Sequence, residues 1–222
     1  MGGNPWLPGH WSIRCMDYLV EVIDLTTLPP AQDVLSEREQ AYYDMLKLPK
    51  RKTEWLGGRI ALKKVVTQCT PYAFKQIEVL PQEKSGKPQL VLDGKSPNLP
   101  FSITHSHGYA VAAVAPQARY IGIDLEKVAH RINAWKQDFF HPSELTEDTD
   151  TFLTALWTQK ESVVKLLGTG LTLNSFEIRC VDGNVQFFGR AQEIYNQLGC
   201  SSITLSTTTL IPGFQFSVAI GK

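Results

Sequence analysis

Residues 151–167, TFLTALWTQKESVVKLL, predict an amphipathic helix that sets the interpretation of the chain around it. Apolar side chains recur at helical spacing along one face, at Phe152, Leu153, Leu156, Val164 and Leu167. A polar face is formed by residues four, three and four positions apart, namely Thr154, Thr158, Glu161 and Lys165. We expect Asp150 or Thr151 to cap the first turn, and the glycines after Leu167 to end the helix.

Short strand patterns separated by turn signals lie on both sides of this helix. We expect strands before it at 15–25, 76–80, 88–92, 101–104, 110–115 and 120–126, and after it at 176–181, 184–188, 203–210 and 214–220. Further helices are expected at 36–48, where Ser36 and Glu39 form a capping box, at 50–67 and at 190–198. Strands and helices mixed in this order predict an α+β fold.

The composition of the chain excludes several classes of protein. It has 222 residues, 43% hydrophobic and 20% charged, with a formal net charge of zero. This is typical of a globular protein, and the lack of a basic excess disfavours nucleic acid as a partner. The sequence has no apolar run long enough to span a membrane and no signal-peptide pattern, and its four cysteines are widely spaced. We therefore expect a cytoplasmic protein with free thiols and no membrane partner.

Charge and a weak internal repeat suggest two lobes. Residues 1–120 carry a net charge of +3, and residues 121–222 carry −3. Gly108, followed by an aromatic residue and an alternating apolar strand, resembles Gly213 and the strand after it. We expect lobes at 1–120 and 121–222, of which the basic one suits a polyanion and the acidic one a metal ion.

The strand at 120–126, YIGIDLE, ends with two acidic residues. Residues two apart in a strand point to the same face, so Asp124 and Glu126 would project together while Ile123 and Leu125 face the core. Paired carboxylates are typical of a Mg²⁺ site, although a solvated strand end has the same pattern.

The polar face of the helix at 151–167 allows two interpretations. Glu161 and Lys165 fit a third metal ligand followed by a phosphate contact. They fit equally a helix-stabilising ion pair, because glutamate and lysine four residues apart attract each other.

Groups that could bind an anion lie in the first half of the chain. Residues 101–108, FSITHSHG, end a strand with hydroxyls and imidazoles before a glycine turn. Zinc is disfavoured there because nothing completes a ligand set around His105 and His107. Several cations each fit either a phosphate contact or solvated surface charge, namely Lys50, Arg51, Lys52, Arg59, Lys63 and Lys87.

The order of these segments is more specific than any one of them. A basic helix is followed by Gly86-Lys87-Pro88, Thr104-His105-Ser106, Gly122-Ile123-Asp124-Leu125-Glu126 and Trp157-x-x-Lys160-Glu161-Ser162-x-x-Lys165. Phe139-Phe140 with Glu144, and Gly168-x-Gly170-Leu171, complete the series. From about Lys50 to Leu173 the chain resembles the 4′-phosphopantetheinyl transferases, more closely the longer, surfactin-synthetase-activating type.

The resemblance implies transfer of the 4′-phosphopantetheine arm of coenzyme A to a serine of an apo acyl or peptidyl carrier protein, with release of adenosine 3′,5′-bisphosphate. It implies Mg²⁺, or Mn²⁺, bound by Asp124, Glu126 and Glu161, with Glu161 and Lys165 as catalytic residues. It implies contacts with coenzyme A at Arg51, Arg59, Lys63, Lys87, Thr104 and His105. It also implies two similar α+β lobes related by a pseudo-twofold axis within one chain, and hence a monomer.

The sequence departs from the family pattern at a few positions. Thr104 stands where serine is commoner, His107 is an unusual residue after the histidine–serine pair, and the first 35 residues match nothing in the pattern. Two other functions stay open: a Mg²⁺-dependent phosphodiester hydrolase, which would use water in place of the carrier serine, and a non-catalytic coenzyme A-binding module.

Overall fold

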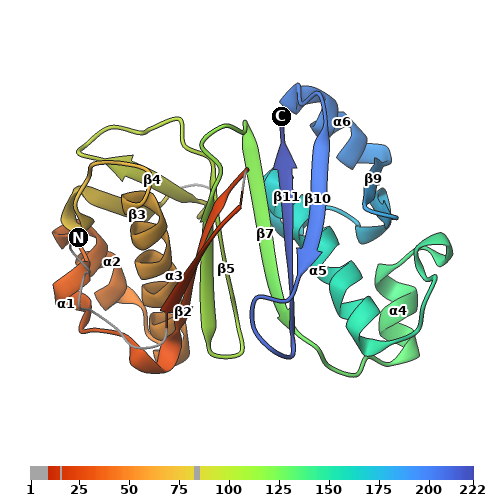
Figure 1. Cartoon of the computed structure of the whole chain (residues 1–222), viewed down its shortest axis with the longest axis horizontal. Coiled ribbons are helices and arrows are strands. Elements are labelled where there is room, and N and C mark those ends of the chain that lie inside the picture. Colours follow the sequence, from red (N-terminus) through yellow and green to blue (C-terminus); the bar gives the residue numbers. More distant parts are fainter. Residues whose placement is uncertain (1–9, 16, 83–85) are drawn as a thin grey trace. The chain divides into compact units, whose positions relative to one another are not determined.

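The computed structural model describes residues 10–15, 17–82 and 86–222, which divide into two units. Unit 1 lies within residues 1–99 and 108–116, and unit 2 comprises residues 100–107 and 117–222. Each unit combines an antiparallel sheet with a long helix, so the predicted α+β class is confirmed (Figure 1). None of the described helices is long and apolar enough to cross a membrane.

Unit 1 is built from β1 (His10–Arg14), β2 (Leu19–Asp24), α1 (Ala31–Val34), α2 (Glu37–Met45), α3 (Pro49–Thr67), β3 (Ile77–Pro81), β4 (Pro88–Leu92) and β6 (Tyr109–Val114). Strand β2 pairs antiparallel with β1 on one side and with β6 on the other. Helix α3 packs against β2 and β6, while β3 and β4 form a separate hairpin. The capping box of Ser36 and Glu39 opens α2 as predicted, but α2 ends at Met45.

Unit 2 is built from β5 (Phe101–Ser106), β7 (Tyr120–Lys127), α4 (Asn133–Phe139), α5 (Asp150–Leu167), β8 (Ile178–Val181), β9 (Asn184–Phe187), α6 (Gly189–Leu198), β10 (Ile203–Thr208) and β11 (Phe214–Gly221). Strand β11 pairs antiparallel with both β10 and β7, and α5 packs against β7 and β11. Strand β5 lies beside β7. Strands β8 and β9 form a hairpin.

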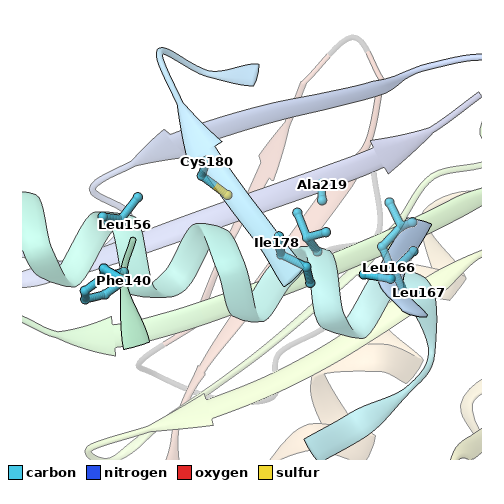
Figure 2. Packing of buried hydrophobic residues seen from close by; sticks show 9 residues of the cluster. Phe140, Leu156, Leu166, Leu167, Ile178, Cys180 and Ala219 are labelled. Atoms are coloured by element: carbon cyan, nitrogen blue, oxygen red, sulfur yellow. The ribbon is translucent and has the colours of Figure 1, made fainter. Parts of the chain in front are cut away.

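Helix α5 matches its prediction closely, with one shift at the start. Thr149, rather than Asp150 or Thr151, is the N-cap, and its side chain accepts a hydrogen bond from the N–H of Phe152. Gly168 ends the helix in a left-handed conformation at φ 71°. The apolar face of α5 packs in a cluster with β8 and β11, in which Figure 2 labels Phe140, Leu156, Leu166, Leu167, Ile178, Cys180 and Ala219.

A buried lysine–glutamate ion pair occurs in each unit. In unit 1, Lys63 of α3 donates to Glu39 at 2.6 Å, and both side chains are fully buried. The Glu39 carboxylate also accepts from the backbone N–H groups of Ser36 and Val79. In this way one carboxylate ties α2, α3 and β3 together.

Unit 2 repeats this arrangement with different residues. Lys160 of α5 lies 2.8 Å from Glu144, whose carboxylate accepts from the backbone N–H groups of His141 and Cys180. Lys160 also donates to the carbonyl of Phe139. The order strand, long helix, hairpin and final strand is shared as well, and the final strands β6 and β11 follow Gly108 and Gly213, both with positive φ. The two units are therefore similar, as the weak repeat in the sequence predicted.

The division between the units differs from the predicted boundary in one respect. The main break at 116/117 lies near the predicted residue 120, but β5 belongs to unit 2. Side-chain hydrogen bonds join β5 to β7 within unit 2: the N–H of Ile123 donates to Ser102, and Thr104 donates to Asp124.

Three of these helices and strands were not predicted, and several strands were predicted too long. The expected strand at 15–25 begins only at Leu19 and ends at Asp24, and the N–H of Cys15 donates to the carbonyl of Tyr18. None of β1, α1 and α4 was expected. Helix α4 has no side-chain cap and no buried residue, so its sequence carries neither of the signals that identify a helix.

Candidate functional site: a carboxylate cluster on β7 and α5

Asp124 is the central residue of the site and is only 5% exposed. Lys165 Nζ of α5 donates to Asp124 Oδ1 at 2.7 Å, and Thr104 Oγ1 of β5 donates to the same oxygen at 3.0 Å. The second oxygen, Oδ2, is buried and has no hydrogen-bond partner. A buried carboxylate oxygen without a partner is costly, so this atom marks a position at which a ligand would be favourable.

Two further carboxylates interact with Asp124. Glu126 follows it on the same face of β7, and Glu161 lies one turn before Lys165 on α5. Burial raises the pKa of Glu126, and the negative charge of Asp124 raises it further. The pKa of Glu161 is raised by the same two causes, in the same order. The negative charge of Asp124 is therefore close enough to Glu126 and Glu161 to oppose the ionisation of both.

The carboxylates of Asp124, Glu126 and Glu161 are suitable ligands for a divalent cation, although their side chains are not arranged as a metal-binding group. Among residues 10–15, 17–82 and 86–222, no three His, Cys, Asp or Glu side chains form a metal-binding group. Lys165 neutralises Asp124 instead. Three carboxylates nevertheless supply the hard oxygen ligands that Mg²⁺ and Mn²⁺ prefer, and Asp124 Oδ2 is unpartnered. Binding by all three requires Glu126 and Glu161 to turn toward Asp124.

Gly122 allows the helix and the strand of the site to approach each other closely. A Cβ atom at this position would lie 1.9 Å from the carbonyl oxygen of Ser162 and 2.5 Å from the backbone nitrogen of Leu166. Any side chain at this position of β7 would therefore push α5 away. The glycine keeps Glu161, which precedes Ser162, near the β7 carboxylates.

Strand β5 contributes a row of hydroxyl groups whose hydrogen bonds to β7 were not predicted. Ser102, Thr104 and Ser106 alternate along the strand and bond to Ile123, Asp124 and Glu126 respectively. The period of two in the sequence could have identified this row. The same alternation directs His105, which is exposed, to the opposite face from Thr104. Their predicted contacts with coenzyme A stay predictions.

Lys63 is not accessible to a phosphate group in this structure. Its side chain is fully buried, and Nζ donates to Glu39 at 2.6 Å, to Val34 O at 2.9 Å and to Phe74 O at 3.3 Å. All three ammonium hydrogens are thus used within unit 1. We correct the interpretation of Lys63 accordingly: its role is structural, and its sequence spacing could not reveal a partner in another helix.

The other predicted contacts with coenzyme A in unit 1 differ in exposure. Arg59 is 8% exposed, donates from Nε to Val79 O at 3.2 Å, and lies 4.0 Å from the ring centre of Trp55. Burial lowers the pKa of Arg59 to about 10. Arg51 and Lys87 are exposed. The predicted metal ligands, Lys165 and Thr104 thus all belong to unit 2, whereas Arg51, Arg59 and Lys87 belong to unit 1.

Comparison with known proteins identifies the family. The family model of the 4′-phosphopantetheinyl transferase superfamily matches residues 120–206, which contain β7 and α5. A holo-[acyl-carrier-protein] synthase of Geobacillus is 34% identical over 87 residues, which cover 36% of this chain and 71% of that protein. A 4′-phosphopantetheinyl transferase of Aneurinibacillus migulanus is 26% identical over 197 residues, covering 84% of this chain and 76% of the relative.

Coverage varies among the other similar proteins. The structure of Helicobacter pylori holo-[acyl-carrier-protein] synthase in complex with coenzyme A matches with a TM-score of 0.39 at 22% identity, covering 46% of this chain and 99% of that one. The chain spans less than two thirds of the length of some curated relatives, 63% for one from Synechocystis and 46% for one from mouse. The matched segment 120–206 and the similarity to the Geobacillus protein show that this chain belongs to the 4′-phosphopantetheinyl transferase superfamily.

Proposed function

We propose that this protein transfers the 4′-phosphopantetheine arm of coenzyme A to a serine of an apo acyl or peptidyl carrier protein and releases adenosine 3′,5′-bisphosphate. The observation that carries the proposal is the cluster in unit 2, where Asp124 has a buried, unpartnered oxygen beside Glu126, Glu161 and Lys165. Family membership supports the same reaction.

The residues of the cluster divide the work of a phosphoryl transfer. The serine oxygen forms a bond to the phosphorus that bears the pantetheine arm, and the bond from that phosphorus to the adenosine bisphosphate breaks. Glu161 accepts the serine proton, because its raised pKa makes the carboxylate a stronger base. Lys165, whose side chain is 30% exposed, offers positive charge to the departing phosphate.

Asp124, Glu126 and Glu161 would hold Mg²⁺ or Mn²⁺, which when bound supplies positive charge to the diphosphate oxygens. Thr104 keeps Asp124 in its rotamer through the hydrogen bond to Oδ1. Arg51, Lys87 and His105 are exposed cations or potential cations that suit the phosphates of coenzyme A. We further propose that the protein is cytoplasmic. We also propose that it is a monomer, since two similar units occur in one chain.

Product analysis distinguishes transfer from hydrolysis. The protein is incubated with coenzyme A and Mg²⁺, with and without an apo carrier protein, and the adenosine 3′,5′-bisphosphate released is quantified by chromatography. We expect release only when the carrier serine is present. Equal release with a carrier whose serine is replaced by alanine would instead indicate a phosphodiester hydrolase.

A further inference from the structure

The similarity of the units provides an internal comparison for the catalytic helix. Aligning Lys63 with Lys160 places Gln68 at Lys165. Gln68 Nε2 donates to Glu21 Oε2 at 3.1 Å in unit 1, just as Lys165 Nζ donates to Asp124 in unit 2. The strand registers agree with this alignment, because Glu21 lies opposite Ala112 as Asp124 lies opposite Ser217.

A chain of buried hydroxyl groups links α5 to the sheet of unit 2. Thr158 Oγ1 donates to Ala155 O at 2.8 Å, so its hydrogen is used and it accepts from Ser217 Oγ, also at 2.8 Å. Ser217 in turn accepts from Thr207 Oγ1 at 2.8 Å, and Thr207 accepts from Gln159 Nε2 at 3.0 Å. This hydroxyl relay connects α5, β11 and β10 at the register position of Asp124.

Unit 1 has no counterpart of the relay among its described residues. The same alignment places Ala61 of α3 at Thr158 and Ala112 of β6 at Ser217, and both alanines are fully buried. Thr158 and Ser217 are also fully buried. In unit 1 a similar helix therefore packs on a similar sheet without these hydroxyl groups, so the relay is not a requirement of the fold. It occurs in the unit that carries the carboxylate cluster.

We propose that Thr158 and Ser217 are positioning residues, which fix α5 along β11 and thereby set Glu161 and Lys165 at their distances from Asp124. Thr158 lies one turn before Glu161 on the same face of α5. Ser217 is directly opposite Asp124 in the antiparallel pair, so their side chains emerge on the same face of the sheet. A bond between these two residues therefore holds the helix in register with the strand that carries the metal ligand. The catalytic part of this inference rests on the proposed function.

The test replaces the relay by the solution found in unit 1. The double variant Thr158→Ala/Ser217→Ala introduces the pair Ala61 and Ala112 already present in the chain, and is expected to fold. Thr154→Val is the matched control, because the Thr154 hydroxyl is buried on the same face of α5, one turn earlier, and has no hydrogen-bond partner. Thr158→Ser keeps the hydroxyl and serves as the rescue variant.

Four quantities are measured for each protein: kcat and KM for coenzyme A in carrier modification, Mn²⁺ affinity by electron paramagnetic resonance, and amide hydrogen exchange of α5. We expect the double variant to lose about tenfold or more in kcat, since small misplacements of catalytic groups are costly. Its KM for coenzyme A should be unchanged, its Mn²⁺ affinity lower, and exchange over residues 158–166 faster. Thr154→Val and Thr158→Ser should behave as the unmodified protein.

The outcomes separate the two proposals. Unchanged kcat, Mn²⁺ affinity and exchange in the double variant would overturn the positioning role while leaving the proposed function intact. Equal losses in Thr154→Val would also overturn it, because they would indicate general helix packing. If the unmodified protein transfers nothing, yet exchange and Mn²⁺ affinity respond only to loss of the relay, the proposed function fails and the positioning role stands.

Discussion

Replacing Gly122 by alanine places a methyl group between β7 and α5, where the backbone leaves no space. The added Cβ would lie 1.9 Å from the carbonyl oxygen of Ser162, whereas ordinary contact begins at 3.4 Å, so α5 must move by about 1.5 Å there. The obstructing atoms are backbone, and no rotamer change relieves them. We expect a loss of about 1–3 kcal/mol in the free energy of unfolding. Because Glu161 moves with Ser162, turnover should fall by about 100-fold.

Urea unfolding and carrier modification measure the two effects separately. Gly57→Ala is the matched control within α3, because its added Cβ would meet Leu25 Cδ2 at 2.1 Å, the end of a side chain that can rotate. Alanine also favours the helix over glycine by about 1 kcal/mol, which offsets that rearrangement. We expect Gly57→Ala to keep its turnover and most of its stability. If Gly122→Ala matched Gly57→Ala in both assays, the close approach of α5 to β7 would not be a requirement of the site.

Three further substitutions test the charges. The raised pKa of Glu161 means that the folded state binds this proton more tightly than the unfolded state, so stability falls as pH rises through that pKa. At pH 7.5 Glu161→Gln should therefore have a higher free energy of unfolding in urea than the unmodified protein, by up to about 1 kcal/mol, and the difference should shrink toward pH 5. The same variant should lose turnover and still bind coenzyme A. Lys63→Met leaves Glu39 buried without its cation and should lower the free energy of unfolding by about 3–5 kcal/mol, much of which Lys63→Met/Glu39→Leu should recover. Equal urea midpoints for the unmodified protein and both variants would contradict the importance of the buried pair. His105 is exposed, so His105→Ala should leave the thermal unfolding midpoint unchanged. The Kd for coenzyme A, measured by calorimetry, should rise about tenfold, as expected for loss of a charged contact. An unchanged Kd would remove His105 from the site.

Local patterns in the sequence predicted the elements that form the site. The period of two in β7 correctly placed Asp124 and Glu126 on one face of the strand. The helical spacing in α5 correctly placed Glu161 and Lys165 on one face of the helix. These features depend on residues near one another in the chain, so a pattern can reveal them.

Features that depend on distant partners were not predictable from spacing. Lys63 was assigned to a phosphate of coenzyme A on the family resemblance, and no local pattern joins it to its partner, Glu39, which lies in another helix. The hydroxyl relay was missed for the same reason: Thr158 was assigned only to a polar face, and Ser217 is more than fifty residues away. The hydrogen bond from Thr104 of β5 to Asp124 of β7 likewise joins residues twenty positions apart, and sequence order does not reveal it.

Intact-mass spectrometry of a carrier protein tests the central claim most directly. An apo acyl carrier protein is incubated with this protein, coenzyme A and Mg²⁺, and parallel samples contain EDTA or the Asp124→Ala variant. We predict that the carrier gains the mass of one phosphopantetheine group, and that the gain is lost in both parallel samples. A carrier that gains the group equally with Asp124→Ala would contradict the assignment of the carboxylate cluster as the site, and intact coenzyme A with unmodified acyl and peptidyl carriers would contradict the transferase itself.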